Sequence, residues 1–125
     1  SKWEPYEYIK DYKYMGLTSE YVKYISKIIN IPINIVHTPS FKVSLNLIKQ
    51  KKCDFLPSAA ITIDRLNYLN FTKPYIHIPL VVATSTKKTA ISNINYLKEH
   101  TFAMVEGYAS IDILKQTHPS LKIKT

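Results

Sequence analysis

The stretch from Cys53 to Tyr75 decides the fold, and it reads Cys-Asp-Phe-Leu-Pro-Ser-Ala-Ala-Ile-Thr-Ile-Asp-Arg-Leu-Asn-Tyr-Leu-Asn-Phe-Thr-Lys-Pro-Tyr. Residues 54–56 are predicted to form a short buried strand. The strand is expected to end at Pro57, because proline has no N–H to donate to a neighbouring strand. The small residues 58–60 follow, and they allow the backbone to approach a ligand closely. This part of the stretch therefore predicts a strand followed by a binding loop.

The second part of the stretch predicts a short helix that carries an unusual residue. Thr62 is a suitable N-cap, and Asp64 suits the first turn of a helix. Arg65 follows as the only arginine in the chain, because the other 16 basic residues are lysines. A guanidinium binds a carboxylate through two parallel hydrogen bonds, which an ammonium group cannot do. The alternative interpretation is a surface arginine that pairs with Asp64 or another acid.

Length and composition indicate an ordinary globular domain. The chain has 125 residues, of which 46% are hydrophobic and 21% charged, so it can build a core and is not predicted to be disordered. The net charge of +8 permits an anionic ligand, a membrane surface or a nucleic acid as partner. The lysines are nevertheless scattered, with no helix-turn-helix or zinc-finger spacing, so no nucleic-acid partner is expected.

The cysteine and histidine content argues against a disulfide and against a metal site. Cys53 is the single cysteine, and the four histidines lack the spacing of metal ligands. We therefore expect neither a metal nor another cofactor. No apolar run approaches the roughly 20 residues of a membrane helix. No signal peptide is recognisable either, so any export signal is expected outside this sequence.

Helical periodicity and strand signals alternate along the chain. Thr18 or Ser19 is predicted to cap the first helix, in which Val22, Ile25 and Ile29 should face the core before Asn30 ends it. A second helix is predicted after the cap Ser40, with Phe41, Leu45 and Ile48 on one face. Further strands are expected at 33–38, 79–84, 102–105 and 122–124. Further helices are expected at 93–97 and 111–116, and Ser92 or Asn93 is predicted to cap the first of these. This alternation predicts an α/β fold with largely parallel strands.

Recognisable catalytic chemistry is missing from the sequence. Gly16 and Gly107 are the only glycines, so there is no glycine-rich phosphate loop. Ser58 and Ser110 have no neighbouring histidine and acid that would suggest a catalytic triad. Asp54 or Glu106 could act as a base, but both positions suit strand ends equally well. We therefore expect no enzyme activity in this chain.

The pieces of the sequence together resemble one family. They are Trp3-Glu4-Pro5-Tyr6, Pro39-Ser40-Phe41, Asp54-Phe55-Leu56-Pro57, Thr62 to Arg65, Phe71-Thr72-Lys73-Pro74-Tyr75 and Glu106-Gly107-Tyr108-Ala109-Ser110. In this order and spacing they resemble the bacterial extracellular solute-binding proteins of family 3. The resemblance is greatest to the periplasmic Venus-flytrap domains that precede histidine kinases.

The resemblance implies a periplasmic-binding-protein-like fold of type II, with two α/β lobes that close on a small ligand. Residues 1–85 would form most of lobe one, 86–87 the hinge and 88–125 the beginning of lobe two. Family members have a strand before Trp3 and continue well past Thr125. The sequence is therefore expected to be an incomplete member, which leaves sheet edges that could pair in a homodimer.

The resemblance also implies which residues bind the ligand. Arg65 would clamp a carboxylate, with Ser58 and Ala60 offering backbone groups and with Trp3 and Phe41 stacking on the ligand. For Trp3 and Phe41, plain core packing is the alternative. From lobe two, a helix N-terminus would contribute through Tyr108, Ala109 and Ser110. Amino-acid binders usually carry hydroxyls where this chain has Ala60 and Ala109, so the ligand class extends to other small anionic or zwitterionic solutes.

Four functions follow as hypotheses. The leading one is a sensory domain at the periplasmic or extracellular face of the inner membrane, in one chain with a membrane-anchored histidine kinase. The second is a free binding protein that delivers amino acids to the permease of an ABC-type transporter. A dehydratase-like enzyme on the same scaffold would need an acid–base pair in the cleft. A nucleic-acid binder, the last, would show steep salt dependence.

Overall fold

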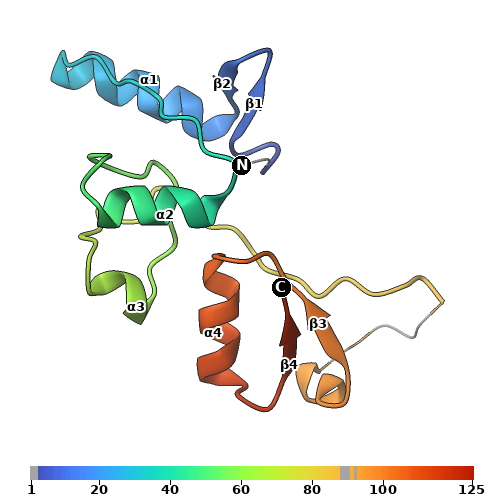
Figure 1. The fold of residues 1–125 in the computed structure, drawn as a ribbon. Helices are drawn as coiled ribbons and strands as arrows, with labels where there is room; N and C mark the ends of the chain where they lie inside the picture. The colour runs from blue at the N-terminus through green and yellow to red at the C-terminus, as the bar shows by residue number, and fades with distance from the viewer. Residues whose placement is uncertain (1–2, 88–90, 92) are drawn as a thin grey trace. The chain divides into compact units, whose positions relative to one another are not determined.

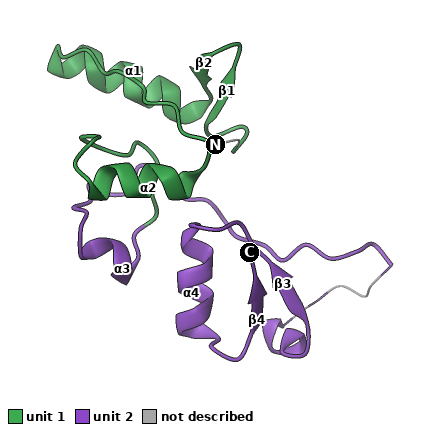
Figure 2. Ribbon diagram, viewed as in Figure 1, with its two compact units in different colours: residues 1–60 green, residues 61–125 purple. Residues whose placement is uncertain are grey.

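The computed structural model describes residues 3–87, 91 and 93–125. They form two compact units, Ser1–Ala60 and Ile61–Thr125, which are described separately below (Figure 2). The division lies between Ala60 and Ile61. The two predicted lobes, 1–85 and 88–125, follow a different boundary, and they remain a prediction.

The first unit begins with a β-hairpin. β1 (Tyr8–Lys10) pairs antiparallel with β2 (Lys13–Met15), with Tyr8 opposite Met15. Asp11 and Tyr12 connect the strands with φ angles of 49° and 61°. Two consecutive positive φ angles characterise the tight hairpin turns that match the twist of the strands. Asp11 and Tyr12 thus form a tight turn between the two strands.

Helix α1 (Leu17–Ile29) starts earlier than predicted. Gly16, with φ of 102°, is its N-cap, and Thr18 and Ser19 lie inside the helix, where both are 2% exposed. The prediction that one of them caps the helix was wrong. Backbone carbonyls from earlier in the chain cap it instead: Leu17 N–H donates to the Pro5 carbonyl at 3.2 Å and Thr18 N–H to the Tyr6 carbonyl at 2.9 Å.

Burial along α1 is confined to its first two turns. Val22 is buried as predicted, but Ile25 and Ile29 are 43% and 48% exposed, so their assignment to the core was wrong. The short strand β2 contacts α1 and lies beside the beginning of the helix (Figure 1). Asn30 ends the helix as predicted, because it adopts a left-handed conformation and its N–H donates to Ser26.

Helix α2 (Phe41–Lys49) begins at its predicted cap. The Ser40 hydroxyl accepts a hydrogen bond from Val43 N–H at 3.3 Å. Phe41, Leu45 and Ile48 are half-buried. The Thr38 and Ser44 hydroxyls lie 2.6 Å apart and tie the preceding segment to the helix.

Three predicted strands are not formed. Residues 33–38, 54–56 and 79–84 are irregular, and within the described ranges none of them pairs with another strand. Their β-branched and apolar residues favour a strand, but a strand also needs a partner for its backbone groups. Leu80 and Val81 are accordingly 69% and 86% exposed.

The second unit contains a β–α–β arrangement. β3 (Thr101–Ala103) and β4 (Lys122–Lys124) pair in parallel, with Phe102 opposite Ile123, and α4 (Ala109–Thr117) connects them (Figure 1). A helix is the usual connection between parallel strands. The predicted strand at 122–124 is confirmed, and the predictions at 102–105 and 111–116 agree with β3 and α4 apart from their ends. The buried apolar residues of the second unit are Leu97, Ala109, Ile111 and Leu121.

Two shorter helices complete this unit. The 3-10 helix η1 (Ile94–Leu97) begins at Asn93, whose side chain accepts a hydrogen bond from Asn95 N–H at 2.9 Å. Asn93 is therefore the cap, as one of the two predictions stated; the other candidate, Ser92, lies outside the described residues. Helix α3 (Ile63–Leu66) carries Arg65.

Candidate ligand-binding site

Arg65 is held in place by the local chemistry of α3. The Thr62 hydroxyl accepts a hydrogen bond from Arg65 N–H at 3.3 Å, so the predicted cap and the predicted helix are both present. The Arg65 carbonyl in turn accepts from Leu69 N–H at 2.8 Å. Thr62 is 6% exposed and Arg65 only 2%. The one guanidinium of the chain is therefore buried, contrary to the alternative of a surface arginine.

The guanidinium contacts the turn that precedes α4. Its Nη2 donates to the Gly107 carbonyl at 2.8 Å, across 42 positions of sequence and within the second unit. Gly107 has a φ of 84°, a conformation that glycine adopts without strain. Tyr108 N–H donates back to the Val105 carbonyl at 3.2 Å, and Tyr108 is the N-cap residue of α4. Arg65 thus lies beside the segment that contains three of the predicted site residues, Tyr108, Ala109 and Ser110.

A cationic side chain and a helix N-terminus come together here. No side chain caps α4 by a hydrogen bond, and a helix N-terminus carries a partial positive charge. Burial lowers the pKa of Arg65, whereas Tyr68, Asp112 and Asp64 act to raise it. An arginine nevertheless remains protonated at neutral pH. Both groups favour negative charge, so the arrangement suits a small anion.

The other four predicted site residues belong to the first unit. The Trp3 ring lies 5.0 Å from that of Tyr6 at an interplanar angle of 46°, and Phe41 is the first residue of α2. Ser58 is half-buried and Ala60 exposed in the loop after Pro57. Because the two units are described separately, the contribution of these residues to a site with Arg65 remains a prediction.

Sequence reasoning missed the direct partner of Arg65. The Gly107 carbonyl is a backbone group, so no side-chain motif marks it. The available signal was the position of Gly107, one of the chain's two glycines, between β3 and α4.

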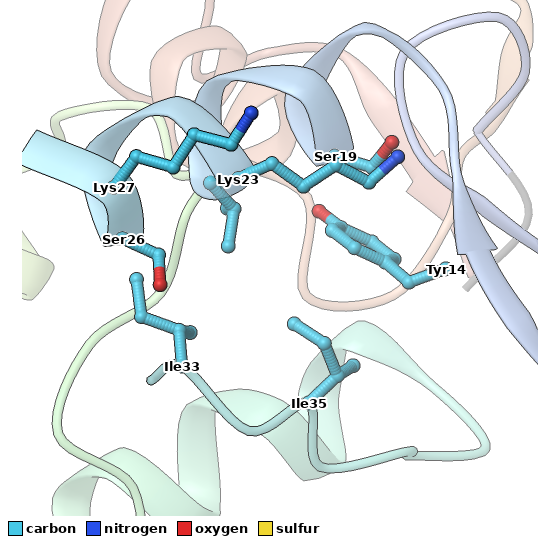
Figure 3. A pocket seen from close by; sticks show the side chains of 8 residues that line it. Tyr14, Ser19, Lys23, Ser26, Lys27, Ile33 and Ile35 are labelled. Carbon is cyan, nitrogen blue, oxygen red and sulfur yellow. The ribbon is translucent and has the colours of Figure 1, made fainter. Parts of the chain in front are cut away.

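The first unit contains a pocket that the sequence did not predict. Its volume is about 300 Å³, and it lies between α1 and the segment after it (Figure 3). Its lining residues are Tyr14, Ser19, Val22, Lys23, Ser26, Lys27, Ile33 and Ile35. The Ser26 hydroxyl already donates to the Ile31 carbonyl, Tyr14 to Glu7 and Lys23 to Glu20. These three polar groups thus bond within the chain itself, and the pocket is a poorer candidate than the Arg65 region.

The described part of the chain contains neither a cluster of metal ligands nor a membrane-spanning helix. Residues 3–87, 91 and 93–125 contain no group of three histidine, cysteine or acidic side chains that could hold a metal ion. In the same ranges, no helix has the length and apolar character needed to cross a lipid bilayer.

The β–α–β arrangement places the chain among α/β domains, and comparison with known proteins specifies the class. Residues 1–124 match the family of bacterial extracellular solute-binding proteins, family 3. The match extends over nearly the whole chain, so the protein belongs to this family. The resemblance seen in the sequence is confirmed.

Individual relatives point to one branch of the family. The chain is 21% identical over 115 residues to the virulence sensor protein BvgS of Bordetella bronchiseptica, and 19% identical to that of Bordetella pertussis. Each match covers 92% of this chain but only 9% of the relative. The crystal structure of the periplasmic VFT2 domain of Bordetella pertussis BvgS superposes with a TM-score of 0.79 at 19% identity, over 98% of this chain and 52% of that one. The fold is therefore that of periplasmic binding proteins, and this chain corresponds to about half of such a domain.

Proposed function

We propose that this protein is the ligand-binding sensory part of a membrane-bound two-component histidine kinase, and that it faces the periplasm. It binds a small anionic or zwitterionic solute, with Arg65 holding the ligand carboxylate. The family membership and the similarity to the BvgS sensors support this proposal. The observation that carries it is the position of the buried Arg65 beside the turn that leads into α4.

The chemistry of this position favours a carboxylate. A guanidinium offers two parallel donors that fit the two oxygens of a carboxylate. The N-terminus of α4, which starts two residues after Gly107, adds a second element that favours negative charge. Tyr108, Ala109 and Ser110 would present backbone groups from this terminus. Ser58, Ala60, Trp3 and Phe41 would contact the rest of the ligand from the first unit.

Signalling would follow from a difference in affinity between two states. A ligand that binds the closed arrangement of the lobes more tightly than the open one shifts the population toward closure. The kinase module in the same polypeptide would respond to that shift, and association of two copies through sheet edges would give a homodimer. Delivery of the solute to an ABC permease is the second candidate. It shares the family and the site, and it differs in requiring no kinase.

A thermal-shift screen of small carboxylates and amino acids tests the proposal. A ligand at about 100 times its dissociation constant should add about 2.7 kcal/mol to the free energy of unfolding. Arg65→Met, which keeps an unbranched apolar stem, should remove the shift. Lys73→Met is the matched control, because it removes an exposed positive charge from the same unit and should leave the shift unchanged.

The outcomes separate the parts of the proposal. A ligand whose effect survives Arg65→Met would contradict the carboxylate clamp while leaving a binding domain. Loss of the effect in both variants would mean that general positive charge, and not Arg65, attracts the ligand. Absence of any hit from the folded protein would contradict the proposed ligand class.

A further inference from the structure

The Arg65 guanidinium makes a hydrogen bond to the backbone within the second unit. Its Nη2 lies 2.8 Å from the Gly107 carbonyl, and the residue is only 2% exposed. The contact joins α3 to the turn before α4, two elements that are 42 residues apart in sequence. A hydrogen bond from a charged donor, withdrawn from water, is among the stronger single interactions in a protein.

Both ends of this contact have local support. On one side, the Thr62 cap fixes the backbone of Arg65, and Tyr68 and Leu69 N–H groups donate to the Arg65 carbonyl at 3.1 and 2.8 Å. On the other side, the turn is closed by Tyr108 N–H donating to Val105, and Ile111 N–H donates to Tyr108 at 3.1 Å. To these bonds within the turn, the Arg65 guanidinium adds a charge-assisted bond to Gly107 from outside it.

We propose that the Arg65–Gly107 bond is a latch that positions the start of α4. Arg65 is in this respect a positioning residue: it holds the turn at 105–108, and with it the direction in which the first N–H groups of α4 point. Both partners of the latch, the Arg65 guanidinium and the Gly107 carbonyl, belong to the chain itself. The latch makes the anion-binding end of α4 preorganised, so that little ordering of this turn remains when a solute binds.

A purely packing role for Arg65 is the competing explanation. A buried arginine stem covers apolar surface, and its removal can destabilise a protein without any loss of a specific bond. The two roles differ in where the effect appears. Loss of packing loosens the whole unit, whereas loss of the latch loosens the turn and the first turn of α4.

Hydrogen exchange resolved to single amides in the intact protein, without added ligand, tests the latch. Arg65→Met keeps most of the stem and removes the donors. We expect the Tyr108 and Ile111 amides to exchange roughly tenfold faster or more, as the loss of a charged hydrogen bond implies. The Met104 amide, which donates to the Lys124 carbonyl in the β3–β4 pair at 2.9 Å, should change little.

Further variants keep the outcome decisive. Arg65→Lys retains a charged donor and should restore part of the protection of Tyr108 and Ile111. If Arg65→Met fails to fold, amide exchange in Arg65→Lys tests the latch instead. Lys73→Met should exchange like the wild-type protein. Equal acceleration at Met104, Tyr108 and Ile111, or no acceleration at any of them, would overturn the latch. Because no ligand is used, this result is independent of whether a carboxylate ever binds.

Discussion

Helices α1 and α3 begin in opposite ways. The start of α3 is capped locally, because the Thr62 side chain accepts the N–H of Arg65 three positions later. The start of α1 has no side-chain cap, and the carbonyls of Pro5 and Tyr6 accept its first N–H groups across the hairpin. The difference teaches that one helix start is a property of its own few residues, while the other exists only when the chain has folded back on itself.

The sharpest way to break the α1 start is to add a single carbon atom. A Cβ at Gly16 would lie 2.5 Å from the Tyr6 carbonyl oxygen and 2.8 Å from that of Pro5, and the φ of 102° disfavours any other residue. Gly16→Ala should therefore destabilise the first unit by about 3 kcal/mol, at the upper end of the range for such backbone strain. Urea unfolding followed by the fluorescence of Trp3, the only tryptophan, reports on this unit.

The neighbouring residue provides the control for Gly16→Ala. Leu17 is 46% exposed and alanine favours helix, so Leu17→Ala should change the unfolding midpoint only slightly. An unchanged midpoint in Gly16→Ala would show that the Pro5 and Tyr6 carbonyls do not constrain the start of α1.

The contrast between the two helix starts also explains what could be predicted from sequence. Ser40, Thr62 and Asn30 mark helix ends through their own side chain or backbone preference, and all three predictions are confirmed. Thr18 and Ser19 look like caps for the same reason, but the cap that forms comes from residues about a dozen positions earlier. Nothing local in the sequence distinguishes the two situations.

The missing strands follow the same logic. Residues 33–38 and 79–84 have the composition of strands, but a strand is defined by the neighbour that pairs with it. The strands of the pair β3–β4 were predicted, at 102–105 and 122–124, on either side of a helix predicted at 111–116. Composition alone could not show which of the other runs finds a partner.

The candidate site was predictable to a similar extent. Its chemistry could be recognised in Arg65, which stands out as the single guanidinium among lysines. Its burial and its bond to Gly107 could not, because both depend on contacts between residues that are distant in sequence. The roles of Trp3, Phe41, Ser58 and Ala60 in ligand binding remain predictions.

A substitution at the start of α3 should lower the stability less than Gly16→Ala does at the start of α1. Thr62→Ala removes a buried hydroxyl that caps the helix, and caps of this kind contribute about 1 kcal/mol. We expect faster hydrogen exchange at the Leu66 amide, which donates to Thr62, and at Leu69. Thr62→Ser keeps the hydroxyl and should behave like the wild type. If Thr62→Ala and Thr62→Ser exchange alike, the side-chain cap does not stabilise α3.

The smallest effect concerns a carboxyl group near the α1 start. Burial raises the pKa of Glu7, while the Tyr14 hydroxyl, which donates to it at 3.1 Å, acts in the opposite direction. The folded state therefore binds this proton more tightly than the unfolded state. The stabilisation is fully present below the pKa that Glu7 has in the unfolded state, near pH 4. It is lost as the pH rises through the higher pKa that Glu7 has in the folded state.

Glu7→Gln isolates this contribution, because glutamine keeps an oxygen that can accept from Tyr14 and cannot ionise. The urea midpoint of the variant, followed by Trp3 fluorescence, should fall less than that of the wild type between about pH 4 and about pH 7. Glu4→Gln changes an exposed acid in the same segment and should reproduce the wild-type pH dependence. A steeper decline in Glu7→Gln would mean that the ionised carboxylate, held by Tyr14, is the form that the fold prefers. The hairpin would then resemble the Arg65 region, where a buried charge is retained because its partners compensate for the loss of water.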